Sequence, residues 1–311
     1  MAQQIRVARA PLRVSMAGGG TDIEPYCSEY GGCVVAGAIQ YYAQAIYPSS
    51  PVIVAEMEQV IMDYFHLKEV VKITNGAPQM SGLGGSAACF VVGIKAVRPD
   101  MPKDEIAALA FHLERNDMGI KGGKQDQYIS AYGGLNYIEF GATVKVESLK
   151  IPVGFEDLLL LVYMGKRKEM GEDIIQDQMQ RYHLPAFHRQ KAIAYSMKAA
   201  LSSKDLISFG KLLDEAWRVK VQYSPYISNA DINTFYADCL KNGAIGGKLT
   251  GAGGGGYMLL MEHPDKAGQL RTYLKKYESI RFDTAGVITE GESNKEGIAV
   301  VNKEGDKDNE S

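Results

Sequence analysis

Apolar residues recur with two different periods along this chain, and stretches of each period alternate in both halves. Val, Ile and Tyr are frequent over residues 5–19 and 33–48, which predicts strands, the first of them broken into short pieces by Pro11. A short strand is predicted over 70–74, and the stretches GGLNYIEF and TVKVESL predict a hairpin over 133–149. Helical spacing predicts helices over residues 56–68, 87–97 and 103–116.

The pattern restarts near Ile151 and Pro152, and this restart predicts a second domain. Strands are predicted there over residues 157–164, 257–261 and 280–288, and helices over 172–182, 185–201, within 203–223, 230–242 and 264–277. We therefore predict one domain over residues 1–152, a second over 153–302, and a disordered tail over 303–311, which has almost nothing to bury.

The composition is that of an ordinary globular protein and narrows the choice of partners. Of 311 residues, 46% are hydrophobic and 23% charged, and the net charge of −3 with scattered Lys and Arg argues against nucleic acid and anionic membrane surfaces. No stretch approaches the roughly 18 apolar residues that span a bilayer, and the N-terminus lacks the apolar core of a signal peptide, so we expect a cytoplasmic protein. Cys27, Cys33, Cys89 and Cys239 lack metal-ligand spacing and are expected to be reduced and structural.

The stretch SGLGGSAA, residues 81–88, lies between a predicted strand and a predicted buried helix. A helix start has unpaired N–H groups and a positive dipole end, and glycines let the backbone approach a ligand, so this order suits a phosphate group. The alternative is a plain glycine turn capped by a serine. A Walker loop is excluded because Gln125 and Leu249 follow the two Gly-Gly-Lys stretches. Gly82-x-Gly84-x-x-Ala87 matches the dinucleotide pattern only weakly, because its strand does not precede it directly.

Four stretches together carry a family resemblance: APLRVSMAGGGTDIEPY, SGLGGSAA, ERNDMGIKGGKQDQYISAYGG and GGKLTGAGGGGYML. In this order they resemble the small-molecule kinases of the galactokinase, homoserine kinase, mevalonate kinase and phosphomevalonate kinase (GHMP) family, over roughly residues 5–290. The resemblance implies an α+β fold of two domains, an N-terminal β-α-β domain and a ferredoxin-like C-terminal domain, with the active site between them. It also implies ATP as co-substrate and Mg²⁺.

Within this family the chain is most similar to the bacterial kinases of D-glycero-D-manno-heptose 7-phosphate. GGKQDQY, Trp217-x-x-Lys220 and Ile227-Ser228-Asn229 carry this likeness. It implies phosphorylation of the anomeric hydroxyl, on the way to nucleotide-activated heptose for surface polysaccharide. Two alternatives stay open: a sugar 1-kinase acting on a fucose- or galactose-like hexose, and a catalytically silent nucleotide-binding regulator. We therefore expect the small-molecule partner to be a sugar or sugar phosphate, and we expect the protein to be a monomer or homodimer.

The resemblance also implies a role for individual residues in phosphoryl transfer. Asp126 is the expected catalytic base and Arg13 the cation beside it, with a helix N-cap and a surface ion pair as the respective alternatives. Glu114, twelve positions before Asp126, is an expected Mg²⁺ ligand together with Ser86; the alternatives are a salt bridge of Glu114 with Arg115 or Arg189 and an N-cap at Ser86. The expected ATP-binding residues are Ser81, Gly82, Leu83, Gly84, Gly85 and Ser86.

The remaining candidates concern the acceptor. The expected substrate-binding residues are Gly19, Gly20, Thr21, Asp22, Lys124, Gly253 and Gly254. The alternatives are an Asx-type turn at Asp22, an exposed Lys124, and a crossing of backbones at the late glycines. The segment Gly165–Ile174 departs from the heptose kinase pattern: it keeps basic residues at 166–168 but lacks the serines expected there.

Overall fold

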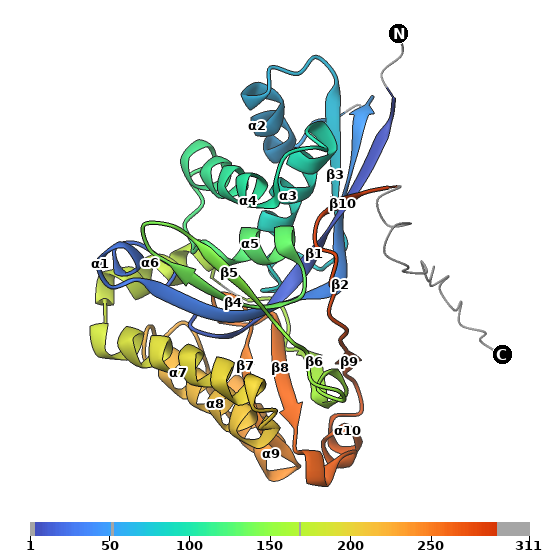
Figure 1. Ribbon diagram of the computed structural model, residues 1–311. Helices are drawn as coiled ribbons and strands as arrows, with labels where there is room; N and C mark the ends of the chain where they lie inside the picture. Colours follow the sequence, from blue (N-terminus) through green and yellow to red (C-terminus); the bar gives the residue numbers. More distant parts are fainter. Residues whose placement is uncertain (1–3, 51–52, 168, 291–311) are drawn as a thin grey trace, which may run out of the picture.

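The computed structural model describes residues 4–50, 53–167 and 169–290, which form two β-sheets with helices packed around them (Figure 1). The first half of the chain builds the larger sheet except for its short edge strand β10 (Ile288–Thr289), and the change to the second sheet falls between β5 (Lys145–Leu149) and β6 (Leu159–Tyr163). This is the α+β arrangement expected from the sequence. The predicted tail over 303–311 and the end of the predicted second domain lie outside the described residues.

The first sheet runs in the order β10-β1-β2-β4-β5, with β3 paired to the far half of β2. Its strands are β1 (Arg6–Ala17), β2 (Gly32–Ser49), β3 (Val70–Asn75), β4 (Leu135–Phe140), β5 (Lys145–Leu149) and β10 (Ile288–Thr289). The helices of this half are α1 (Tyr26–Tyr30), α2 (Glu56–Tyr64), α3 (Gly85–Val97), α4 (Lys103–His112), the π-helical turn η1 (Leu113–Asp117) and α5 (Gln125–Tyr132). Helices α3 and α5 pack against β1 and β2.

Strand β1 is continuous, whereas the sequence predicted short pieces broken by Pro11. It pairs antiparallel with β2 along its whole length, and the register shifts between Pro11 and Leu12. An irregularity of this kind accommodates a residue that has no N–H to donate to the ladder. The predicted break is therefore wrong, because the ladder shifts its register at the proline and does not end there.

The second sheet has four antiparallel strands in the order β7-β8-β6-β9. These are β6 (Leu159–Tyr163), β7 (Ala244–Leu249), β8 (Tyr257–Glu262) and β9 (Glu278–Ser279). Helices α6 (Gly171–Arg181), α7 (Leu184–Ser202), α8 (Leu206–Lys220) and α9 (Ala230–Lys241) connect β6 to β7, and α10 (Gln269–Leu274) connects β8 to β9. This order of strands and helical connections is ferredoxin-like, as expected.

Three segments of the second half differ from the prediction. Strand β7 was not predicted, because its residues Gly246 and Gly247 have low strand propensity. The helix predicted over 264–277 is a 3₁₀ turn (η3, Pro264–Lys266) and the short α10, separated by Gly268 in the left-handed region (φ 89°). The strand predicted over 280–288 contributes one bridge, between Phe282 and Ile39, and the first residue of β10.

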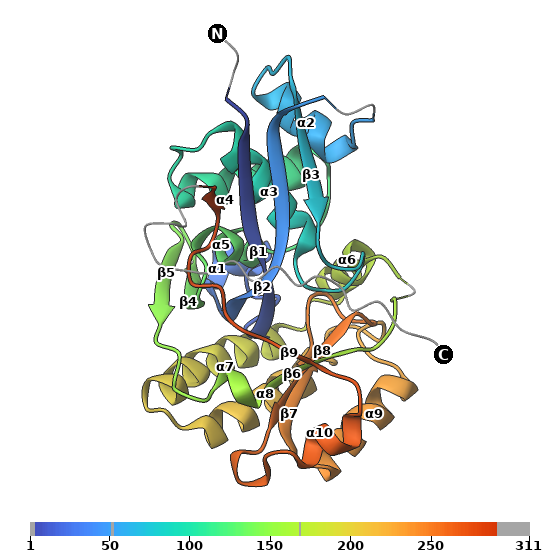
Figure 2. The same cartoon turned by 90° about the vertical axis from the view of Figure 1, so that its right-hand side faces the viewer.

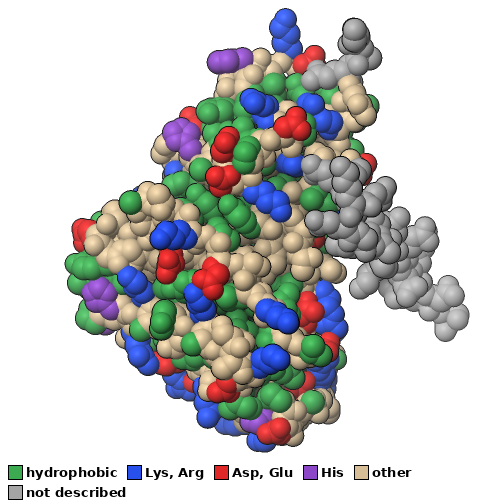
Figure 3. Space-filling view, in the orientation of Figure 1, with side chains coloured by type: hydrophobic (Ala, Val, Ile, Leu, Met, Phe, Trp, Pro, Cys, Tyr) green, Lys and Arg blue, Asp and Glu red, His purple; other side chains and the backbone are tan. Residues whose placement is uncertain are grey.

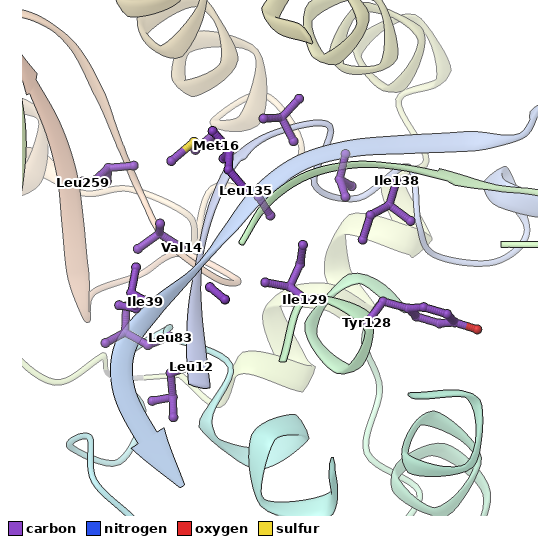
Figure 4. Packing of buried hydrophobic residues seen from close by; sticks show 14 of the residues in the cluster. Leu12, Val14, Met16, Ile39, Leu83, Tyr128, Ile129, Leu135, Ile138 and Leu259 are labelled. Atoms are coloured by element: carbon purple, nitrogen blue, oxygen red, sulfur yellow. The ribbon is translucent and has the colours of Figure 1, made fainter. Parts of the chain in front are cut away.

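The two sheets share one buried core. Figure 4 shows Leu259 of β8 in the same cluster as Val14 and Met16 of β1. The chain returns from β9 to the first sheet, where Ala8 of β1 lies opposite Thr289 of β10 (Figure 2). The second half of the chain thus ends on the first sheet, and a division of the chain at residue 152 stays a prediction.

Gly246 of β7 lies directly against α8. A Cβ atom built at this position would lie 2.0 Å from the carbonyl oxygen of Gly210 in α8, a contact that the backbone must move to relieve. We expect Gly246→Ala to lower the free energy of unfolding by about 1–3 kcal/mol in urea denaturation, the usual cost of overpacking. Gly141→Ala is the matched control, because no atom lies within 4 Å of its Cβ position, and a loss of equal size there would contradict the explanation.

The surface charges, the helices and the cysteines can be compared with what the composition predicted. Lys, Arg, Asp and Glu side chains are interspersed on the face seen in Figure 3. None of the helices within the described ranges has the length and apolar character needed to cross a membrane. All four cysteines lie in the described ranges, where they are buried and form no disulfide.

Candidate active site

The glycine-rich loop before α3 presents a bare helix start to a cavity. Gly84 is the N-cap of α3 in the left-handed conformation (φ 74°), and no side chain caps the helix. The first N–H groups of α3 are therefore free to bind an anion, with the helix dipole in the favourable direction. Ser86 lies inside the first turn and is not the N-cap, which removes that alternative for its hydroxyl.

The cavity has a volume of about 400 Å³ and lies where the two halves of the chain meet. Its walls come from β1, the glycine loops at 19–20, 81–86 and 251–252, η1, the start of α5, and α6 with the end of α8. Predicted residues that line it are Arg13, Gly19, Gly20, Asp22, Ser81, Gly82, Gly84, Gly85, Ser86, Glu114 and Asp126. Residues that the sequence places more than 100 positions apart thus share one cavity.

Asp126 and Arg13 form a two-point ion pair in the wall of this cavity. Arg13 Nε donates to Asp126 Oδ1 at 2.7 Å and Nη2 donates to Oδ2 at 2.5 Å. The same guanidinium donates through Nη1 to the carbonyl of Gly82, at 2.5 Å. Arg13 is buried, with 5% of its side chain exposed, whereas Asp126 keeps 26% exposed toward the cavity. The pair therefore holds a carboxylate at a fixed distance from the glycine loop.

Gly84 lies directly against this ion pair. A Cβ atom at Gly84 would stand 3.2 Å from both Arg13 Cγ and Asp126 Oδ2. The glycine is thus required by its left-handed conformation and by the close approach of the loop to Asp126.

Glu114 lies beside the loop in the π-helical turn that ends α4. Its carboxylate accepts hydrogen bonds from the Gln127 amide and the Ser86 hydroxyl. Burial raises the pKa of Glu114, and the nearby Arg115 opposes that rise. Its alternative partners do not hold it: Arg189 pairs with Glu215, and Arg115 donates to the carbonyls of residues 120 and 123.

Asp22 ties the first glycine loop to the loop before α5. Its carboxylate accepts from the backbone N–H of Gly20 and Gln125, at 3.1 Å each, and from the Gln125 side-chain amide at 3.2 Å. Burial raises the pKa of Asp22, and these backbone hydrogen bonds lower it. A carboxylate offers about four lone-pair positions, and these donors make four contacts with the two oxygens of Asp22.

Five of the predicted residues are not among those that line the cavity. Lys124 pairs with Glu24 at 2.8 Å. Leu83 is fully buried, and the Thr21 hydroxyl donates to the carbonyl of Gly18 at 2.8 Å. Gly253 and Gly254 pack against Ile227 and the carbonyl of residue 226, which is the backbone crossing named as their alternative. In their place Gly251 and Ala252 line the cavity.

Other cavity residues had no role assigned from the sequence, although Lys220 and Arg167 lie in stretches that the sequence analysis named. Gln125 donates to the carboxylate of Asp22, and Gln127 donates to that of Glu114. Arg167, Gln178 and Lys220 line the wall contributed by the second half of the chain. The side-chain nitrogen of Gln178 is buried without a hydrogen-bond partner. Gln125 and Gln127 stand beside Asp126 in GGKQDQY, which was a usable signal, whereas nothing in the sequence marks Gln178.

Comparison with known proteins gives the family. Residues 52–134 match the GHMP kinases N terminal domain and residues 197–279 match the GHMP kinases C terminal domain. The chain is 30% identical to a D-glycero-alpha-D-manno-heptose 7-phosphate kinase of Campylobacter jejuni, over 93% of this chain and 97% of the relative. The chain belongs to the GHMP kinase family. It is accordingly an ATP-dependent phosphotransferase. The similarity to sugar kinases of this family indicates that it is a sugar kinase.

Solved structures agree with this GHMP kinase assignment. A D-glycero-D-manno-heptose 1-phosphate kinase from Bacteroides thetaiotaomicron superposes with a TM-score of 0.70 at 25% identity, over 92% of this chain and 98% of that one. A putative sugar kinase from Campylobacter jejuni gives a TM-score of 0.69 at 29% identity, over 93% of this chain and 99% of its own. The two-domain GHMP kinase fold expected from the sequence is thereby confirmed.

Proposed function

We propose that this GHMP kinase transfers the γ-phosphoryl group of ATP to the anomeric hydroxyl of D-glycero-D-manno-heptose 7-phosphate. The name of the Campylobacter jejuni relative supports this substrate, at 30% identity over 93% of the chain. We place the reaction in the cytoplasm, in the synthesis of nucleotide-activated heptose for surface polysaccharide, and expect a monomer or homodimer.

The observation that carries the proposal is the fixed distance between Asp126 and the glycine loop. Arg13 holds both, through the carboxylate on one side and the carbonyl of Gly82 on the other. Asp126 accepts the proton of the anomeric hydroxyl or orients that hydroxyl, whose oxygen then forms a bond to the γ-phosphorus. The bond from this phosphorus to the bridging oxygen of ATP breaks, and ADP leaves. Such chemistry depends mainly on positioning and charge stabilisation.

The remaining residues of the cavity position the two substrates. The free N–H groups at the start of α3 hold the ATP phosphates, and Asp22 with the backbone of Gly19 and Gly20 faces the sugar. Thr21 and Leu83 contribute to substrate and ATP binding through the backbone of their two glycine loops, and their side chains take no part. Lys124 supports the site from outside the cavity by its ion pair with Glu24.

The residues around Glu114 fit a Mg²⁺ ion. Its carboxylate contacts the Ser86 hydroxyl beside the phosphate loop, and both oxygens are ligands that Mg²⁺ prefers. Within the described ranges no three His, Cys, Asp or Glu side chains gather into a metal site made of protein alone. This agrees with Mg²⁺, which is bound through one or two carboxylates and the phosphates of the substrate. When bound, the ion would neutralise phosphate charge.

A substrate panel tests the proposal. Purified enzyme with ATP and Mg²⁺ is offered heptose 7-phosphate, the same heptose without phosphate, galactose, fucose and mevalonate, and ADP release is measured. We expect turnover with heptose 7-phosphate alone, and ³¹P NMR should place the new phosphate on the anomeric carbon. Turnover of free galactose or fucose would replace this substrate by a hexose. Tight ATP binding without any turnover would favour the nucleotide-binding regulator.

A further inference from the structure

Two buried cations of the cavity have no carboxylate partner among the residues that the structure describes. Arg167 and Lys220 are 8% and 6% exposed, and both line the cavity from the second half of the chain. In the part of the chain that the structure describes, no carboxylate oxygen lies within 4.0 Å of either one, whereas Arg13 is paired with Asp126. A buried cation without an opposite charge is costly in the free protein, so an anionic ligand is the expected compensation.

Main-chain carbonyls at the edge of the phosphate loop fix the position of both cations. Arg167 donates to the carbonyl of Met80 through Nε at 3.2 Å and Nη2 at 3.0 Å. Lys220, the last residue of α8, donates to the carbonyl of Gly251. Met80 precedes Ser81 of the loop, and a Cβ atom at Gly251 would stand 2.8 Å from the Cα atom of Gly82. The two cations therefore face the side of the cavity where the phosphate loop lies.

Two further groups of hydrogen-bond donors lie on the same wall: the first backbone N–H groups of α6 and the side-chain amide of Gln178. Arg167 Nη1 lies against the start of α6, where a Cβ atom at Gly171 would be 2.7 Å away, and no side chain caps this helix. Gln178, on α6, is 3% exposed and its amide nitrogen has no partner. Glu172 also lines the cavity, outside ion-pair distance of both cations. Positive charge and unpaired donors thus converge on this wall, as in a site for an oxyanion.

We propose that Arg167 and Lys220 bind a phosphate group, which is either the phosphate ester carried by the acceptor sugar or the γ-phosphate of ATP. In both cases a phosphate dianion supplies the charge that the two cations lack. The inference rests on the proposed sugar kinase function for the source of the phosphate, but the residues concerned lie outside the Asp126, Arg13 and Glu114 machinery. In the first case they select sugar phosphates over free sugars.

Binding measurements on Lys220→Met and Arg167→Gln test the inference without any sugar. Calorimetry measures three affinities of the enzyme. Two are for the Mg²⁺ complexes of ADP and of the non-hydrolysable ATP analogue AMP-PNP. The third is for inorganic phosphate, titrated into enzyme that is already saturated with AMP-PNP. Loss of a hydrogen bond to a charged group predicts an affinity lower by about 10–100-fold. An acceptor-phosphate site loses phosphate binding and keeps AMP-PNP affinity. A γ-phosphate site loses AMP-PNP affinity and keeps ADP affinity.

Matched controls come from the same two segments. Arg218→Gln changes an exposed arginine two residues before Lys220 on α8, and Lys166→Gln changes the exposed residue next to Arg167. Both controls should bind every ligand like the wild type. If the two test variants fold, by circular dichroism, and also bind phosphate, AMP-PNP and ADP within twofold of wild type, the inference is overturned. Should one variant fail to fold, the other decides. A sugar panel without turnover would contradict the proposed function and leave this result standing.

The pH dependence gives an independent readout. Burial, with the charges of Arg13 and Arg167, lowers the pKa of Lys220 to about 8, and the carboxylates of Asp22 and Asp126 oppose that change. The protonated lysine binds an anion, so the affinity of the wild type for the phosphate-bearing ligand should fall as the pH rises above about 8. Lys220→Met should lack this fall. A wild-type affinity that stays constant from pH 7 to pH 9.5 would contradict a contact with Lys220.

Discussion

Asp126→Asn is expected to lower kcat by about 10²–10⁴-fold, the usual contribution of a general base, while the affinity for ATP stays close to that of the wild type. The amide cannot take the proton of the acceptor hydroxyl. It also cannot accept both hydrogen bonds from Arg13, which now reach the two carboxylate oxygens. In the proposed function ATP binds mainly through the loop before α3, whose residues this change leaves in place. Steady-state ADP release and calorimetry with AMP-PNP measure the two quantities.

Two further variants make this test specific to the ion pair. Asp238→Asn changes an exposed carboxylate that pairs with Lys241 on α9, and it should leave kcat unchanged. Arg13→Met removes the cation, and because the two residues act together, its effect should not add to that of Asp126→Asn in the double variant. If Asp126→Asn keeps near-full kcat, Asp126 is not the base. Fully additive losses would mean that Arg13 acts separately.

The helices and strands that the sequence predicted best are those with a strong apolar pattern. The run from Ala87 to Val97 is almost entirely apolar, and every residue of it is buried in α3. The hydrophobic pattern alone was enough there. It was insufficient where the structure depends on pairing: β7 contains two glycines, and its place is set by β8 and by the close approach of Gly210 in α8. The register shift at Pro11 likewise depends on the partner strand, which is distant in sequence.

The candidate site likewise contains residues that a local motif predicts and residues that only the folded chain brings together. Arg13, Asp22 and Asp126 come from motifs with nearby glycines and meet in the cavity, whereas Lys124 of the same GGKQDQY motif pairs with Glu24 instead. Glycines in a motif do not reveal on which side the chain will pass, so Gly253 and Gly254 were expected at the substrate and instead cross another segment. Gln178 lines the cavity only because α6 folds over it, and no local pattern contains that information.

Glu114→Gln is expected to raise the Mg²⁺ concentration needed for half-maximal activity by about 10–100-fold, the size of effect known for residues that support metal sites. The substitution keeps the size of the side chain and removes its charge. Because burial raises the pKa of Glu114, ionising this carboxylate is costly in the protein without metal and nucleotide. E114Q should therefore be at least as stable as the wild type in urea without Mg²⁺, although its activity is lower. Such a gain in stability with a loss of activity is typical of a residue kept for function.

The control for this experiment is Glu105→Gln, an exposed carboxylate on α4, the helix that leads into Glu114. It should change neither the Mg²⁺ dependence nor the stability by more than about 0.5 kcal/mol, as for most surface substitutions. Ser86→Ala gives a second reading, because its hydroxyl contacts the same carboxylate, and it should raise the Mg²⁺ requirement in the same direction. An E114Q enzyme with unchanged Mg²⁺ dependence and reduced stability would assign Glu114 to the structure of the π-helical turn. In that case the metal would be held by Ser86 and the ATP phosphates without a carboxylate from this helix.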